Sequence, residues 1–581
     1  MARASNEQLD GNVLHNALAA CRRHLTFVIM FSFALNILYL TPSLFMLQVY
    51  DRVLASGDVL TLVFLLVVLV LALGTLAFLD GTRIRLLAAM AKRFDRLVAP
   101  YVLNAALSKE GRAAAGQVQL VRELDTLRSA VSGPPALAAI DAPWTPVYIG
   151  VCFMIHPWLG ALTLGGGALL LLIAFINQRA SSRALRANLQ ASGAMYSLQQ
   201  ADSAQLETAR AMGMRKALVM RQLRARETMS DAMRKQARSG AVYTSSTKFF
   251  RLLLQSSALG LGVLLALEQQ ISAGAIVAAS ILAARAFQPI ELIVGAWSQF
   301  EQGRQAYDVL KAVLKTEDNA RDHTGLPTPQ GSLSVESVGV RAPGSDRALV
   351  YNASFRVSPG EIIGVVGPSG AGKSTLLRTA VGAITPDQGV VRLDGAKLSD
   401  WDPEQLGRYV GYLPQDIGLL QGTVADNIGR FSREAHNDAD IVAAAQAVGA
   451  HEMILSLAKG YDTEIGAGGR GLSIGQAQRV ALARAFYRDP MFLGLDEPNA
   501  HLDGDGERAL IAALHAARAR GAASVVVAHS SAIVAVVDKL LVVRDGRIEA
   551  FGPRDQVAAR LAGGQARPAV VASGGETVGR S

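Results

Sequence analysis

A glycine-rich segment in the second half of the chain has the composition of a phosphate-binding site. It reads Gly367, Pro368, Ser369, Gly370, Ala371, Gly372, Lys373, Ser374 and Thr375. An apolar, β-branched run at 362–366 precedes it, and Leu376 and Leu377 open a helical pattern behind it. A strand, a glycine loop and a helix in this order predict a loop that binds a nucleoside triphosphate.

The residue types in this loop suit the chemistry of a triphosphate. Glycine lets the backbone N–H groups curl around phosphate oxygens, and the N-terminus of the following helix adds a favourable dipole. We expect Lys373 to reach the β- and γ-phosphates and Ser374 to ligate Mg²⁺.

Two acids further along complete the expected chemistry. The apolar run at 492–495 ends in Asp496 and Glu497. We expect Asp496 to hold Mg²⁺ and Glu497 to polarise the attacking water as a general base. A purely structural pair of acids is the alternative, and the domain-length interval that separates the pair from Lys373 argues against it.

The elements that must position these groups make up only half of the chain. At 581 residues the chain predicts two or more domains, and its 50% hydrophobic residues combined with 18% charged residues predict a membrane half fused to a soluble half. We expect a cytoplasmic segment at 1–24, a membrane domain at 25–315, a linker at 316–330, a nucleotide-binding domain at 331–562 and a disordered tail at 563–581.

The membrane domain is expected to contain six spans of roughly 20 residues each. Their approximate limits are 25–49, 59–79, 135–155, 158–177, 246–267 and 271–296. His156-Pro157 separates the third span from the fourth, because proline ends one helix and starts the next. The last pair is interrupted by charged residues that either lie at helix ends or line a cavity, namely Lys248, Arg251, Glu268, Arg285 and Glu291.

The distribution of the net charge of +9 predicts orientation. Lys and Arg are concentrated in the long connectors at about 80–134 and 178–245, and the short connectors contain only Arg52. Basic residues stay on the cytoplasmic side, so both termini and the nucleotide-binding domain are expected there. The basic excess is therefore attributed to a lipid bilayer and not to nucleic acid.

Both long connectors have helical patterns and could each present a tip to a soluble domain. We expect these tips at 122–129 and at 207–214, and exposed helix with no coupling role is the alternative.

The two cysteines, Cys21 and Cys152, match neither a disulfide framework nor a metal site and are interpreted as apolar fillers.

Further short motifs lie around the two acids in a characteristic order. The segment between loop and acids contains Leu472, Ser473, Ile474, Gly475 and Gln476, with Gln415 upstream and with Asp503 and His529 downstream. This combination resembles the ABC cassette throughout. The implied fold is a six-helix, all-α ABC exporter transmembrane domain fused to an α/β P-loop NTPase domain.

The resemblance implies a mechanism that needs two copies of the chain. The signature residues, Ser473 and Gly475 above all, are expected to touch the γ-phosphate held by Lys373 of the partner subunit, as in ABC homodimers. Gln415 is expected to sense Mg²⁺ and water, His529 to hold the γ-phosphate, and Asp503 to form the D-loop. The implied cofactors are ATP and Mg²⁺.

Phrases in the first half resemble bacterial type I secretion permease/ATPases, especially the subgroup that exports proteases, lipases and haem-binding proteins. They lie at 45–54, 141–148, 156–160, 211–214 and 271–280. The resemblance implies ATP-driven export of an unfolded polypeptide, recognised by a C-terminal signal, from the bacterial inner membrane. A periplasmic membrane-fusion adaptor and an outer-membrane channel are the implied partners. Since fewer than thirty residues precede the first span, no leader-cleaving domain is expected.

Four positions depart from the family pattern. Ile474 replaces a glycine, Ala477 an arginine, Ala342 an adenine-stacking aromatic and Ala467 a glutamate. A branched residue at 474 restricts the backbone where it must approach phosphate, and this favours one alternative, an ATP-binding regulator with little turnover. Hydrolysis is still expected, because Lys373, Asp496, Glu497 and His529 are present. An ABC exporter of lipid or small hydrophobic molecules would share every nucleotide motif and is the other alternative.

Overall fold

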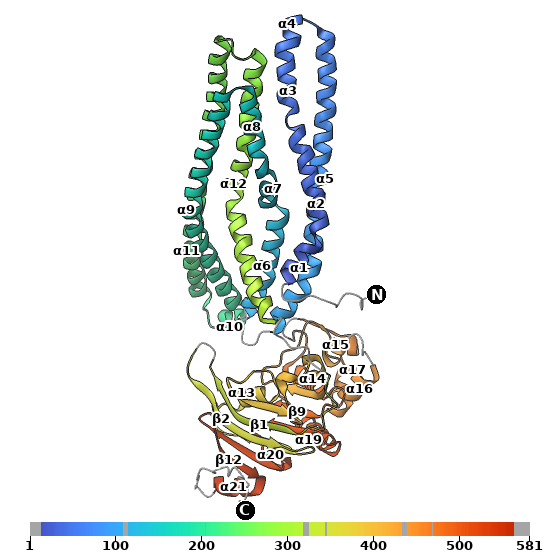
Figure 1. Cartoon of the computed structure of the whole chain (residues 1–581). Helices are drawn as coiled ribbons and strands as arrows, with labels where there is room; N and C mark the ends of the chain where they lie inside the picture. Colours follow the sequence, from blue (N-terminus) through green and yellow to red (C-terminus); the bar gives the residue numbers. More distant parts are fainter. Residues whose placement is uncertain are drawn as a thin grey trace, which may run out of the picture. The chain divides into compact units, whose positions relative to one another are not determined.

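The computed structural model describes residues 13–108, 114–203, 205–317, 325–342, 345–432, 438–466 and 469–562. The chain divides into two compact units, Met1–Asn319 and Ala320–Ser581. The first unit is helical, and the second combines helices with β-sheets (Figure 1). The expected tail at 563–581 and Ala467 lie outside the described residues.

Twelve α-helices are described in the first unit. They are α1 (Val13–Ala20), α2 (Arg22–Leu38), α3 (Thr41–Gln48), α4 (Leu54–Ser56), α5 (Val59–Ser108), α6 (Ala114–Ser132), α7 (Pro134–Asp141), α8 (Thr145–Ile155), α9 (Pro157–Ser203), α10 (Leu206–Ala211), α11 (Arg215–Leu267) and α12 (Ala273–Glu317). A π-helix (Val49–Val53) joins α3 to α4, and a 3-10 turn (Ala142–Trp144) joins α7 to α8.

Among the described residues, six helical segments are long and apolar enough to cross a membrane, which confirms the expected six-helix membrane fold. They run over Arg22–Ser56, Val59–Leu107, Gln119–Ile155, Pro157–Ile176, Arg215–Leu267 and Ala273–Lys315. Most of them extend well beyond the apolar runs in the sequence, because the same helices continue into polar sequence. Hydropathy alone therefore underestimates the helix lengths.

Proline and glycine divide these helices at the expected type of position. His156 has an extended backbone and ends α8, and Pro157 begins α9, as predicted. α4 ends at Gly57, which has a φ of +67°. Glycine adopts this left-handed conformation readily because it has no Cβ.

A buried ion network ties the first and third spans to α5. The Arg83 side chain donates to Asp141 at 3.0 and 3.1 Å and to Asp80 at 2.8 Å, although Arg83 is only 5% exposed. Asn36 of α2 also donates to Asp141, at 3.3 Å. Arg83 belongs to the expected connector at about 80–134, and the structure places its side chain in the packed interior of the helical unit.

The charged residues of the last pair of spans have different surroundings. Glu268 caps the end of α11, as expected for a helix terminus. Arg251 forms an ion pair with Glu291 at 2.9 Å. Arg285 lies over the ring of Tyr39 at 4.1 Å and lines a cavity of about 300 Å³ together with the buried ion network.

The two predicted connector tips have different outcomes. Residues 122–129 lie inside α6, where Leu124 and Leu127 are buried, so this segment is not a tip and the prediction is wrong. The apolar spacing that suggested a tip serves helix packing instead. The second segment does lie at a turn: α10 and the exposed Met212 connect α9 to α11 (Figure 1).

Both cysteines are buried and free, which confirms their interpretation as fillers.

The described part of the second unit forms three β-sheets. Their strand orders are β2-β1-β4-β5, β12-β11-β3-β10-β9-β6 and β7-β8. The strands are β1 (Leu333–Arg341), β2 (Ala348–Val357), β3 (Ile362–Val366), β4 (Gln388–Leu393), β5 (Ala396–Lys397), β6 (Val410–Leu413), β7 (Gly422–Thr423), β8 (Glu464–Ile465), β9 (Phe492–Asp496), β10 (Ala523–Val527), β11 (Lys539–Arg544) and β12 (Arg547–Pro553).

Nine α-helices are described in the same unit. They are α13 (Lys373–Ala380), α14 (Pro403–Tyr409), α15 (Val424–Ile428), α16 (Asp438–Ala447), α17 (His451–Leu455), α18 (Ile474–Phe486), α19 (Gly504–Ala519), α20 (Ser531–Val536) and α21 (Arg554–Ala562). Strands and helices alternate along much of the unit, which confirms the α/β prediction.

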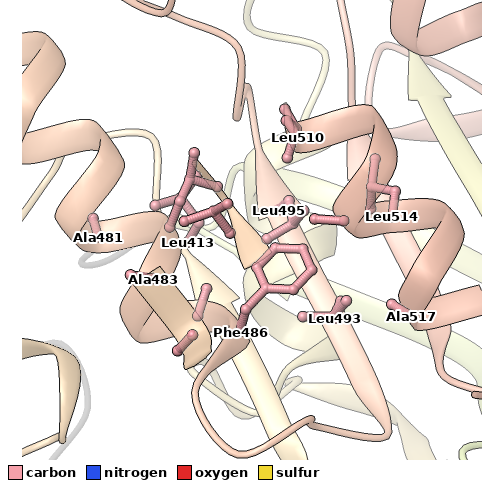
Figure 2. Close-up of a cluster of buried hydrophobic side chains, with 14 of the residues drawn as sticks. Leu413, Ala481, Ala483, Phe486, Leu493, Leu495, Leu510, Leu514 and Ala517 are labelled. Atoms are coloured by element: carbon pink, nitrogen blue, oxygen red, sulfur yellow. The ribbon is translucent and has the colours of Figure 1, made fainter. Parts of the chain in front are cut away.

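Two hydrophobic cores cover the two faces of the six-stranded sheet. Successive strand residues point to opposite faces, so Leu493 and Leu495 of β9 belong to one core and Phe492 to the other. Phe486 of α18 and Leu514 of α19 pack in the first core with the β9 leucines (Figure 2). The first core therefore fixes α18, which begins at the signature residues, against the strand that ends in the two acids.

Candidate functional site

The expected catalytic groups follow the ends of neighbouring parallel strands. Strands β3, β10, β9 and β6 are parallel to one another within the six-stranded sheet. The glycine loop follows β3, His529 follows β10, Glu497 follows β9 and Gln415 follows β6. Because the carboxyl ends of parallel strands share one edge, the sheet collects these four groups in one place.

The glycine loop has the close backbone approaches that exclude side chains. Gly367 has a φ of +153°, and a Cβ there would lie 2.1 Å from the carbonyl oxygen of Val543. Gly372 has a φ of +96°, and its Cβ would lie 2.5 Å from the carbonyl oxygen of Leu349. Gly372 directly precedes α13, so backbone N–H groups gather at the start of this helix, as the sequence predicted.

Lys373 lies across this loop. Its Nζ donates to the carbonyl oxygens of Gly367 at 2.8 Å and Pro368 at 3.0 Å, and the residue is only 6% exposed. The ammonium group is therefore held inside the loop, where a triphosphate would supply stronger acceptors than the two carbonyl groups.

Asp496 is buried beside the start of α13. It is 2% exposed and accepts a hydrogen bond from Ser374, while its Oδ1 atom has no hydrogen-bond partner among the described residues. Burial raises the pKa of this carboxyl, and the Ser374 hydrogen bond and the charge of Lys373 offset part of the increase. A buried carboxylate oxygen without a partner, next to a hydroxyl, has the chemistry of a Mg²⁺ site.

Glu497 meets two of the other predicted residues. Its Oε1 lies 3.3 Å from Nε2 of His529 and accepts from Nε2 of Gln415 at 3.5 Å. The Glu497 backbone has a φ of +49°, a left-handed conformation that is uncommon for a residue with a side chain. Gln415 lies 82 positions before Glu497 in the sequence, and His529 lies 32 positions after it. The fold therefore brings all three side chains together at the strand edge.

The signature residues lie elsewhere in the unit. Ser473 caps α18: its Oγ accepts from the backbone N–H of Gln476 at 3.3 Å, and the Gln476 side chain accepts from the Ser473 N–H at 2.8 Å. Within the described residues, neither a hydrogen bond nor an ion pair joins Leu472–Gln476 to the loop at 367–375. The structure therefore does not bring the signature to the phosphate loop of its own chain.

Three contacts join α18 to the segment that follows Glu497. The Gln478 side chain donates to the Pro498 carbonyl at 2.9 Å, and Arg479 pairs with Asp503 at 2.5 Å. A Cβ at Gly475 would lie 3.0 Å from the carbonyl oxygen of His501. Sequence reasoning missed Gln478 and Arg479, although their position directly behind the signature was a signal.

Asp503 also begins the next helix. Its carboxylate accepts from the backbone N–H of Gly506 at 2.8 Å and caps α19. This backbone hydrogen bond lowers the pKa of Asp503, and the hydrogen bond from Arg479 lowers it further by a smaller amount.

The described departures from the family pattern have simple local surroundings. Ile474 begins α18 and is 63% exposed, so its branched side chain meets nothing that strains its own subunit. Ala477 is buried in the core beneath α18, where an arginine would require a polar partner. Ala342 follows β1 and supplies no ring for adenine, as expected.

Comparisons with known proteins agree with this geometry. The family model described as "ABC transporter" matches residues 350–500. The chain is 40% identical over 543 residues to the type I secretion system ATP-binding protein PrsD of Rhizobium meliloti (strain 1021), with 93% of each chain covered. It is 27% identical to the cyclolysin secretion/processing ATP-binding protein CyaB of Bordetella pertussis, covering 94% of this chain and 77% of that protein.

A solved structure shows the same fold. A bacterial Atm1-family ABC exporter with ATP bound has a TM-score of 0.80 and 21% sequence identity to this chain, and the match covers 95% of this chain and all of the other. At this identity the likeness concerns architecture alone. Taken with the extended similarity to PrsD, it leads to one assignment: the chain belongs to the multi-pass membrane ABC transporter ATPases of type I secretion systems.

Proposed function

We propose that two copies of this chain form an exporter that uses ATP to move an unfolded polypeptide across the bacterial inner membrane. The observation that carries this proposal is the 40% identity to a type I secretion ATP-binding protein over 93% of both chains. Relatives at 27–28% identity are named for the translocation of cyclolysin and leukotoxins. These names favour polypeptide export over the export of lipid or small hydrophobic molecules.

The chain is an ATPase of the ABC transporter family, and its residues have separate tasks in hydrolysis. Backbone N–H groups of the loop at 367–375 hold the phosphates, and Lys373 turns from its carbonyl partners to the β- and γ-phosphates. Glu497 accepts the proton of the attacking water. His529 holds the γ-phosphate, and Gln415 orients the water beside Mg²⁺.

The residues around Asp496 fit Mg²⁺. The free Oδ1 of Asp496 and the hydroxyl of Ser374 would hold the ion, with Gln415 nearby. Bound Mg²⁺ would neutralise charge on the β- and γ-phosphates.

The other half of each site comes from the partner subunit. Within the described residues, Ser473 makes no hydrogen bond to the phosphate loop of its own chain. It caps the N-terminus of α18 and is exposed. In the dimer, Ser473 and Gly475 complete the site formed around the partner subunit's Lys373, and Asp503 lies beside this interface. ATP binding therefore joins two subunits, and hydrolysis separates them.

Further parts of the proposal concern assembly in the cell envelope. Both termini and the nucleotide-binding unit lie on the cytoplasmic side, because the basic residues cluster in the long connectors. The turn at α10 transmits nucleotide state to the spans. A periplasmic adaptor and an outer-membrane channel complete the export path, and a C-terminal signal on the cargo is recognised.

Secretion itself tests the proposal. In the source bacterium, the chromosomal copy is replaced by Glu497→Gln, and the proteins in the culture medium are compared with those of the parent strain. One or a few polypeptides are expected to disappear from the medium and to co-purify with the variant. An unchanged set of secreted proteins together with a changed lipid composition of the envelope would contradict polypeptide export.

A further inference from the structure

The backbone at Glu497 is held in a costly conformation. A φ of +49° is disfavoured for a residue with a Cβ, and such conformations persist only where the surroundings hold them. The same residue carries the carboxylate that meets His529 and Gln415. The groups that hold this turn therefore also set the direction of the carboxylate.

Backbone hydrogen bonds hold Glu497 at both of its peptide groups. The Glu497 N–H donates to the Val527 carbonyl at 3.1 Å, and the Ala500 N–H donates to the Glu497 carbonyl at 3.1 Å. Between them stands Pro498, which has no N–H to donate. Its carbonyl oxygen accepts from the Gln478 side chain at 2.9 Å, and Gln478 is only 3% exposed.

Gln478 does not come from the strands that build the sheet edge. It lies one helical turn after the start of α18, the helix that begins with the signature. The next residue, Arg479, pairs with Asp503 further along the same turn segment. Gly475 approaches the carbonyl of His501 so closely that a side chain would have to displace it.

We propose that Gln478 is a positioning residue for Glu497, and that α18 thereby connects the signature of each subunit to the general base of the same subunit. The proposal rests on the proposed function, in which Ser473 completes the partner subunit's site. Closure of Ser473 on the partner's nucleotide then acts on the turn that carries the subunit's own Glu497. Nucleotide binding at one active site therefore affects the general base of the other site through the buried side-chain amide of Gln478.

The test uses two copies of the full chain joined as a tandem dimer in nanodiscs, with Lys373→Ala in one copy so that only one site turns over. Gln478→Met removes the donor at nearly constant volume. Placed in the copy that supplies the working Glu497, it is expected to lower kcat about tenfold. KM for ATP should change by less than about twofold, since the phosphate loop is untouched.

Placement of the same substitution in the other copy separates positioning from general damage. There, the affected Glu497 is idle, so a smaller loss of kcat is expected. Equal losses from both placements, or wild-type kcat from the first placement, would overturn the inference. A fall in the melting temperature that accounts for the loss of kcat would overturn it as well.

Three further variants sharpen the result. Arg479→Lys is expected to retain more activity than Arg479→Gln, because only lysine preserves the ion pair with Asp503. Gln446→Met on the exposed surface of α16 is the matched control and should hydrolyse ATP like the parent. A parent dimer that hydrolyses no ATP would count against the proposed function, whereas a hydrolysing parent that Gln478→Met does not slow counts against this inference alone.

Discussion

The strand edge of the nucleotide-binding unit and the buried ion network of the helical unit both gather charged side chains in packed surroundings. At the strand edge, each group lies at or directly after the end of one parallel strand of the six-stranded sheet. In the helical unit, Arg83 and Asp80 come from α5 and Asp141 comes from α7. Among the described residues, the first arrangement leaves a carboxylate oxygen of Asp496 without a partner. The second pairs the charge of Arg83 with Asp80 and Asp141, although the Nε atom of Arg83 has no hydrogen-bond partner there.

This difference distinguishes residues that serve catalysis from residues that stabilise the fold. Unpaired and strained groups at the strand edge are available to a ligand, whereas the paired charges in the helical unit hold helices together. We therefore expect substitutions at the edge to abolish turnover with little loss of stability. Substitutions in the network should have the reverse effect.

The largest effect is expected for Glu497→Gln. Loss of the general base should lower kcat about 10³-fold, because general base catalysis typically contributes 10²- to 10⁴-fold. The melting temperature should stay near that of the parent, since the Glu497 side chain is partly exposed. Steady-state ATPase assays and thermal unfolding of the same purified protein measure both quantities. A large loss of stability would remove the contrast with the helical unit.

The next largest effect is expected for Arg83→Met. Removal of one partner leaves Asp80 and Asp141 without their cation, and breaking a buried pair costs about 3–5 kcal/mol. Thermal unfolding in nanodiscs should show a lower transition temperature for the helical unit. Arg234→Met removes an exposed ion pair with Asp231 and is the matched control, expected to cost less than about 1 kcal/mol. Similar transitions for both variants would show that the network contributes little.

A smaller effect of opposite sign is expected for Asp496→Asn. Burial raises the pKa of this carboxyl in the folded protein, so at neutral pH its charge destabilises the fold relative to the unfolded chain. The amide removes the charge and should stabilise the nucleotide-free protein at neutral pH.

The pH dependence of the stabilisation by Asp496→Asn is the control for this prediction. As pH falls through the raised pKa, the parent carboxyl becomes protonated and the advantage of the amide should disappear. Thermal unfolding without nucleotide or Mg²⁺, measured across the acidic to neutral range, records it. A gain that stays constant with pH would show that charge is not the cause.

Much of the nucleotide-binding unit could be predicted from the sequence because its chemistry is local. The loop at 367–375 and the acids after β9 each combine an apolar strand with a short polar segment. Parallel strands then bring them to one edge by topology alone. Six membrane helices followed in the same way from the length of apolar runs.

The missed features depend on tertiary packing. The ion network of Arg83 was missed because its partner Asp141 lies 58 positions away. Residues 122–129 looked like a connector tip, although their leucines pack inside the helical unit. Gln478 was overlooked because its partner is a backbone carbonyl, which carries no sequence signal. Local patterns identify groups that follow a strand end, but not groups that meet across a core.

Complementation between two inactive variants tests the central claim, that one subunit's signature completes the other's phosphate loop. Chains with Lys373→Ala and chains with Ser473→Ala are purified separately and then mixed under conditions that exchange subunits. A mixed dimer contains one intact composite site, so the ATPase rate should rise above that of either variant alone. A rate no higher than the average of the two separate variants would contradict the account.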